Sequence, residues 1–85
     1  MWSKNSVRGH LAGVAELKHR KILGEAIRNY RKKAGLTQEQ LAEKADLHHN
    51  FIGGVERGTM EISVTSLLRI AKALRIKLGD LIDQL

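Results

Sequence analysis

The fold is decided by residues 38–57, which read QEQLAEKADLHHNFIGGVER. Thr37, the residue before this stretch, forms a capping-box pattern with Gln40, in which each side chain reaches the backbone N–H group of the other residue. The pattern predicts that a short helix begins here. A tight turn at residues 46–47 follows it, and a second short helix is expected over residues 49–56.

The apolar residues of this stretch stand at the offsets that two crossed helices need. Ala42 is small, as required where the helices approach closely. Ile52 and Val55 have branched apolar side chains that can fill the space between the two helices. About three residues separate the two helices, and Gly58 is a natural stop for the second. This spacing is typical of a helix-turn-helix, although by itself it also fits an αα-hairpin in an unrelated helical bundle.

The rest of the chain has a helical pattern too. It contains no proline, and its apolar residues recur at intervals of three and four, as they do along one face of a helix. A first helix ends at the stop signal of residues 33–35, a fourth is capped by Ser63 or Thr65, and a fifth ends the chain. The expected buried residues are Ile22, Leu23, Ala26, Ile27 and Tyr30 in the first helix, and Leu67, Leu68, Ile70, Ala71 and Leu74 in the fourth.

These elements predict an all-α fold of five helices around one core. A length of 85 residues allows one domain, and residues 21–85 are expected to form it. Residues 1–20 are the part that the pattern determines least. They are either a basic N-terminal arm or a marginal extra helix lined by Leu11, Val14 and Leu17.

The charge of the chain is positive and unevenly distributed. The formal net charge is +6, and nine of the 15 Lys and Arg residues lie within residues 1–35. Such a segment can meet a polyanion or can be a solvated face. No apolar run reaches the roughly 18 residues of a membrane span, and the first residues lack the apolar core of a signal peptide. We therefore expect a small basic protein of the cytoplasm, without a membrane partner.

Metal and catalytic chemistry finds little support in the residues. Cysteine is absent, which excludes disulfides, Cys-based zinc sites and thiol nucleophiles. His48 and His49 are adjacent, so they do not share a helical face as two metal-binding histidines at i and i+4 would. No glycine-rich phosphate loop follows a strand, because no strand is credible. We expect no metal, no cofactor and no enzymatic activity.

Three segments of the chain together resemble a known family. Residues 36–42 (LTQEQLA), 51–58 (FIGGVERG) and 67–74 (LLRIAKAL) are similar to the Cro/C1 or XRE-type helix-turn-helix transcriptional regulators, which include phage repressors and the controller proteins of restriction–modification systems. The resemblance extends over about residues 22–82. It implies a lambda-repressor-like domain that regulates transcription by binding a palindromic operator in double-stranded DNA as a homodimer, with the third helix in the major groove.

The resemblance also implies which residues contact bases. With Ile52 and Val55 inward, the third helix is expected to leave its other side open to DNA. Asn50 can bind the N6 and N7 edge of adenine in bidentate fashion, and a histidine can donate to guanine. Two alternatives stay open: the histidines contact only phosphate, and the glycines serve packing instead of letting the backbone approach DNA. The expected base-contacting residues are His48, His49, Asn50, Gly53 and Gly54.

Other matched positions imply contacts that orient the domain without reading sequence. Gln38, at the start of the second helix, and Arg57 and Thr59, on the other side of the groove, are expected to contact phosphates. Arg31 and Glu56 match a structural ion pair that joins the first helix to the third. Two turn positions where the family often has glycine hold Asp46 and Arg75 here, which leaves the geometry of those turns open.

Partner surfaces are the least defined expectation. The apolar residues of the last helix form either a homodimer interface or part of the monomer's core: Leu78, Leu81, Ile82 and Leu85. Glu39 and Glu43 either touch RNA polymerase or form a solvated face. As an alternative function, the protein is the antitoxin of a toxin–antitoxin pair. The domain would then bind a toxin as its main role and DNA as a secondary one.

Overall fold

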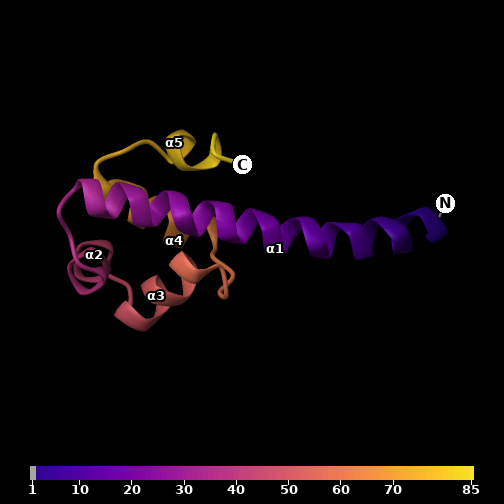
Figure 1. Ribbon diagram of the computed structural model, residues 1–85, viewed down its shortest axis with the longest axis horizontal. Helices are drawn as coiled ribbons and strands as arrows, with labels where there is room; N and C mark the ends of the chain where they lie inside the picture. Colours follow the sequence, from indigo (N-terminus) through magenta and orange to yellow (C-terminus); the bar gives the residue numbers. More distant parts are fainter. Residues whose placement is uncertain (1) are drawn as a thin grey trace.

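The computed structural model describes the backbone of residues 2–85 and the side chains of residues 17–85. Over these residues the chain forms five helices joined by short turns and loops, with no strand, so the predicted all-α fold is confirmed. Figure 1 shows how the shorter helices gather along one half of the first one. In chain order the helices are α1 (Trp2–Lys33), α2 (Gln38–Ala45), α3 (His49–Arg57), α4 (Val64–Leu74) and α5 (Leu78–Ile82).

Helix α1 sets the length of the molecule. A helix of its 32 residues extends about 48 Å at about 1.5 Å per residue, which equals the longest dimension of the molecule, 48 Å. Residues 2–20 continue α1 in one piece, and the N-terminal half projects beyond the other helices (Figure 1). A separate extra helix is thus not what forms there. Gly9 and Gly13 lower helix propensity by about 1 kcal/mol each, but neither ends the helix as a proline would.

The helix starts follow the local rules that the sequence obeys. The Thr37 hydroxyl accepts the Gln40 N–H at 3.1 Å, and the Gln40 side chain accepts the Thr37 N–H at 2.9 Å, so the capping box is complete. Ser63, and not Thr65, caps α4, because its hydroxyl accepts the N–H of Ser66 at 3.1 Å. Each cap satisfies a backbone donor that the first turn of a helix leaves without a partner.

The helix ends use left-handed residues, including two that are not glycine. Gly58 ends α3 with φ 76°, as expected. Asp46 and Arg75 end α2 and α4 with φ 56° and 58°. Their turns therefore keep the left-handed geometry in which glycine is favoured, at a cost of roughly 1–2 kcal/mol for a residue with a side chain.

The core lies where α1, α2, α3 and α4 meet and is closed by α5. Leu68 is the one buried residue predicted for α4 that is instead exposed, at 40%. The buried stripe of α4 runs at intervals of three, four and seven residues from Leu67, which places Leu68 one position outside it. The largest side chains that are fully buried come from all five helices: Ile27, Leu41, Ile52, Ile70 and Leu81.

Gly24 allows α1 to lie directly against the backbone of α3. A Cβ atom at this position would collide with the carbonyl oxygen of Val55 and lie 2.6 Å from that of Glu56. Backbone atoms cannot move aside as a flexible side chain can, so no larger residue fits without separating the helices. Gly24 was not among the residues predicted from the sequence, although a glycine within the apolar stripe of a helix was a usable signal.

Candidate nucleic-acid interface

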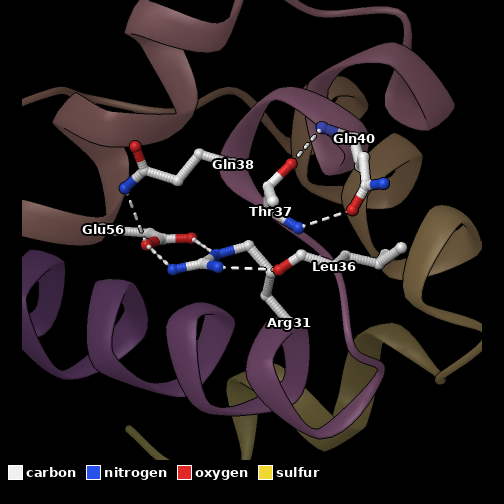
Figure 2. A network of polar contacts seen from close by, with 6 residues as sticks. All are labelled: Arg31, Leu36, Thr37, Gln38, Gln40 and Glu56. Carbon is white, nitrogen blue, oxygen red and sulfur yellow. Dashed lines mark hydrogen bonds and ion pairs between the residues drawn. The ribbon is translucent and has the colours of Figure 1, made fainter.

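A buried polar network fixes α3 relative to α1 and α2. Arg31 of α1 and Glu56 of α3 form the ion pair that the family resemblance implies, with Nε to Oε2 at 2.6 Å and Nη2 to Oε1 at 3.0 Å. The remaining Arg31 nitrogen donates to the carbonyl oxygen of Leu36 at 2.8 Å. Gln38, the first residue of α2, donates its side-chain N–H to Glu56 Oε1 at 3.0 Å (Figure 2).

The network is stabilising only because it is complete. Arg31 and Glu56 are 9% and 7% exposed, and removing charges from water is costly unless every polar atom finds a partner. In the part of the chain whose side chains are described, no buried side-chain nitrogen or oxygen lacks one. Three elements and the loop before α2 are thereby held in one arrangement. The position of α3 against the rest of the domain is fixed from its inner face.

The first turn of α3 presents two histidines and an asparagine to solvent. His48 is the N-cap, and its Nδ1 accepts the backbone N–H of Asn50 at 3.1 Å. A ring nitrogen that accepts carries no proton in the neutral form, so the proton is on Nε2 and available to an acceptor. The rings of His48 and His49 stack, with centroids 4.6 Å apart. All three residues are exposed, as base-contacting residues have to be.

The two glycines of α3 are covered, and the expectation that both lie exposed is wrong. Gly53 and Gly54 are buried. A Cβ on Gly53 would lie 3.2 Å from Nη1 of Arg57 and 3.5 Å from Oε1 of Gln38, and one on Gly54 would collide with the side chain of Met60. The side chains of Gln38, Arg57 and Met60 occupy the space that the two glycines leave. Long side chains commonly lay their CH₂ groups along an open surface while their polar ends stay in water.

The far end of α3 joins a loop that is bonded back to the helix. Gly58 N–H donates to the Val55 carbonyl at 3.0 Å, and Thr59 donates both its N–H and its hydroxyl to the Gly54 carbonyl, at 2.9 and 3.1 Å. Both donors of Thr59 are therefore used within the chain. Arg57 is exposed and keeps its charge at the surface. Of the two residues expected to contact phosphate here, Arg57 is the better placed.

The outward face of α3 carries no negative charge. Successive helix residues are about 100° apart, so Asn50, Gly54 and Arg57 lie opposite the inward Ile52 and Val55. Glu56, the acidic residue of α3, points inward to Arg31. Beside the first turn of α3, Glu39 and Glu43 of α2 line an open hollow of about 370 Å³ together with His48 and His49. The face itself combines neutral hydrogen-bonding groups with a cation, a composition suited to a polyanion.

Comparison with known proteins identifies the arrangement of α2 and α3. Residues 27–81 match the helix-turn-helix family HTH_3. The chain belongs to this helix-turn-helix family. Its members regulate transcription by binding DNA, and the resemblance to Cro/C1-type regulators that the sequence indicated is thereby confirmed.

The individual proteins similar to this chain include several that are named as control or controller proteins. The chain is 38% identical over 65 residues to control protein C.BamHI of Bacillus amyloliquefaciens, covering 75% of this chain and 80% of that protein. It is 40% identical over 65 residues to control protein C.SmaI of Serratia marcescens, covering 76% and 77%. The crystal structure of the restriction–modification controller protein C.AhdI from Aeromonas hydrophila superimposes with a TM-score of 0.72 at 37% identity, covering 73% of this chain and 94% of that one.

The apolar residues of the last helix divide between the core and the surface. Leu81 is completely buried within the monomer and Leu78 is partly buried against the same core, so these two complete the fold. Ile82 and Leu85 are 44% and 48% exposed. The four residues thus do not form one open surface, because α5 turns one side toward α1 and α4. Among them, Ile82 and Leu85 are the ones that a partner can reach.

Neither a metal site nor a membrane span is found in the described part of the chain. No group of three His, Asp or Glu side chains in residues 17–85 is arranged to hold a metal ion. None of the helices described combines the length and the apolar character needed to cross a membrane.

Proposed function

We propose that the protein is a sequence-specific regulator that binds a palindromic operator in double-stranded DNA as a homodimer, with α3 of each protomer in the major groove. One observation carries the proposal: the inner face of α3 is fixed by the Arg31–Glu56–Gln38 network, while Asn50 and Arg57 are exposed on the opposite face. An α-helix of about 10–12 Å diameter fits a major groove about 12 Å wide.

The proposed base contacts come from the first turn of α3. Asn50 reads adenine through two hydrogen bonds, and His48 and His49 donate to guanine or to phosphate. The cap geometry supports this for His48, because Nδ1 is occupied by the Asn50 N–H and Nε2 is left as the donor. Gly53 and Gly54 are covered by the side chains of Gln38, Arg57 and Met60. We therefore expect these side chains, and not the glycine backbone, to face the bases at this part of the helix.

The proposed phosphate contacts lie on both sides of that turn. At the start of α2 the Gln40 N–H is bonded to Thr37, but the N–H groups before it have no partner within the helix and attract an anion. The Gln38 side chain is held in place by Glu56. Arg57 supplies a cation on the other side. Thr59 can join only by giving up a hydrogen bond to Gly54, so we assign it the smallest share.

Homodimerisation is proposed through the exposed part of the C-terminal helix. Ile82 in this helix and Leu85, three residues beyond its end, provide apolar surface, and Leu78 and Leu81 support it from the core side. A two-fold dimer places its recognition helices about 34 Å apart, one turn of DNA, and requires a palindromic site. Sedimentation of the free protein tests this step: a monomer at all concentrations would contradict it.

The names of the relatives support a more specific role. C.BamHI, C.SmaI and C.AhdI are described as control or restriction–modification controller proteins, so we propose that this chain controls transcription in such a system, in the cytoplasm. The alternative of an antitoxin has no comparable support. A gene neighbourhood with a nuclease and a methyltransferase is expected; a toxin gene beside this one would reverse the preference. Glu39 and Glu43, which are exposed on α2, are the residues to test for contact with RNA polymerase if the protein activates transcription.

The deciding experiment is selection of a binding site from random DNA, followed by affinity measurements over a salt series. We expect a palindromic sequence bound at least about 10³-fold more tightly than random DNA, with log affinity falling linearly against log salt at about 0.9 per neutralised phosphate. Binding without sequence preference would contradict the proposal.

The N-terminal half of α1 has a separate test in the same assay. It carries Lys4, Arg8 and Lys18, and we propose that its charge neutralises additional phosphates. Deleting residues 1–18 is then expected to lower affinity and to flatten the salt dependence by about 0.9 for each phosphate that these side chains neutralise. Among residues 17–85 the first buried residue is Leu23, so the deletion removes none of the buried residues described there. Unchanged affinity and slope would show that the segment does not contact DNA.

A further inference from the structure

We propose that Met60, from the loop between α3 and α4, is a specificity-determining residue that reads the 5-methyl group of thymine in the major groove. The inference deepens the proposed function and rests on it, because it requires α3 to enter the groove. It assigns to a loop side chain the contact that the middle of α3, with its two glycines, does not make itself.

The side chain of Met60 lies on the outward face of α3. Its Cβ and Sδ atoms are 3.4 and 3.5 Å from the point where a Gly54 side chain would begin, and its Cγ overlaps that point. Gly54 is on the same face as Asn50 and Arg57, at intervals of four and three residues. Met60 therefore occupies the centre of the surface that the proposed function turns toward the bases.

The loop holds Met60 in this place through backbone bonds. Thr59 donates twice to the Gly54 carbonyl, at 2.9 and 3.1 Å, and Gly58 takes the left-handed conformation at φ 76° that turns the chain back. Met60 follows immediately. Because Thr59, its neighbour, is bonded to Gly54, the backbone of Met60 is held beside the residue that its side chain covers.

The chemistry of the contact follows from exposure. Met60 is 42% exposed, and the residues that share a helix face with Gly54, Asn50 and Arg57, have polar side chains. The major-groove edge of a base pair that offers an apolar partner is the thymine 5-methyl group. A thioether side chain is flexible and polarisable, which suits an irregular apolar contact of this kind.

The same geometry gives a physical reason for Gly54. Glycine inside a helix costs about 0.5–1 kcal/mol relative to alanine, and nothing in the backbone of α3 requires it, since its positive-φ glycine is Gly58. A Cβ atom at position 54 would collide with Cγ of Met60, so any side chain there forces the Met60 side chain to move. Gly54 is thus the space that allows a loop residue to reach the groove.

The test uses the full chain and the selected operator, with each thymine replaced in turn by deoxyuridine, which lacks only the methyl group. One methyl group is worth about 0.8 kcal/mol of burial, so at one thymine of each half-site the wild-type protein is expected to lose about fourfold in affinity. Met60→Ala is expected to bind thymine and deoxyuridine equally there. Met60→Leu, which keeps an apolar side chain, is expected to retain part of the preference.

Gly54→Ala is the second, independent variant. It leaves Met60 in the sequence but moves it off the face, and is therefore expected to abolish the same thymine preference. Val64→Ala is the matched control, because it removes an apolar side chain that is 67% exposed at the start of α4 and that is not part of the proposed reading surface. Its thymine preference is expected to equal that of the wild type. Circular dichroism and thermal unfolding check that each variant is folded.

The possible outcomes separate this inference from the function on which it rests. Failure of the wild-type protein to select any site contradicts the proposed function, and Met60 with it. A selected operator whose deoxyuridine effects are the same in wild type and Met60→Ala contradicts the role of Met60 alone. A uniform loss of affinity in Met60→Ala, with the methyl preference kept, also overturns it, because Met60 would then be a general contact.

Discussion

The two faces of α3 differ in what fixes them. On the inner face Ile52, Val55 and Glu56 are almost fully buried, and Glu56 is bonded to two other elements. On the outer face Asn50 and Arg57 are exposed, with no partner helix over them. One side of this nine-residue helix thus packs against the rest of the domain, and the other side is proposed to contact the DNA bases. Substitutions on the two sides should have different consequences.

The largest effect is expected from breaking the buried ion pair. Glu56→Ala leaves the Arg31 guanidinium and the Gln38 amide without their acceptor in a dry site, and losing one partner of a buried pair costs about 3–5 kcal/mol of unfolding free energy. Denaturant unfolding measures it. Glu61→Ala is the matched control, since it removes a glutamate that pairs with Arg20 at 3.4 Å but is 82% exposed; such pairs contribute about 0–1 kcal/mol. Equal losses in the two variants would contradict the comparison.

The next largest effect is expected where α1 packs against α3. Gly24→Ala forces a methyl group against the backbone carbonyls of Val55 and Glu56, and overpacking of this kind costs about 1–3 kcal/mol. Gly79→Ala is the matched control, because a Cβ there has nothing within 4 Å. The control is expected to be neutral or slightly stabilised. A Gly24→Ala protein as stable as wild type would mean that α1 and α3 do not approach this closely.

An outer-face substitution is expected to change DNA recognition without changing stability. Asn50→Ala removes the proposed bidentate contact, which is worth about 1–3 kcal/mol of discrimination against the wrong base. Binding to operators changed at each base pair should show the loss at one adenine per half-site only. The unfolding free energy should stay within about 0.5 kcal/mol of wild type. A uniform loss across all sequences would assign Asn50 to phosphate contact.

The smallest effect is expected at His48, where the two roles meet in one side chain. His48→Ala removes the cap on the Asn50 N–H, and losing an N-cap costs about 1 kcal/mol. His48→Asn is the matched variant, since asparagine caps well but has no Nε2 donor. It should restore stability while leaving DNA binding weakened. Full binding by His48→Asn would restrict His48 to capping.

Local rules account for most of what the sequence predicted correctly. The capping box of Thr37 and Gln40, the stop at Gly58 and the buried stripe around Ile27 depend on residues within about one or two turns of each other, so they can be found without the fold. Only the resemblance to the family predicted the pair of Arg31 and Glu56, because 25 residues separate them and no local rule joins such positions.

The errors arose where distant side chains or a small change of angle decide exposure. Leu68 is apolar but lies one position outside the buried stripe, and at the chain end the burial of Leu81 beside the exposed Ile82 depends on how α5 is turned. Gly53 and Gly54 were expected to be bare, yet residues from α2, from the end of α3 and from the next loop cover them. For residues 2–20 the sequence left an arm and an extra helix open; they continue α1, and no proline interrupts them.

By itself the sequence determined five helices, the capping box that begins the second, one core and membership of a helix-turn-helix family, because periodicity and capping are properties of neighbouring residues. Only the tertiary structure decided that Gly24 brings α1 against the backbone of α3, that Gln38 joins the buried ion pair and that Met60 covers Gly54. Those features depend on the distances between separate elements, and such distances follow from packing all the helices together at once.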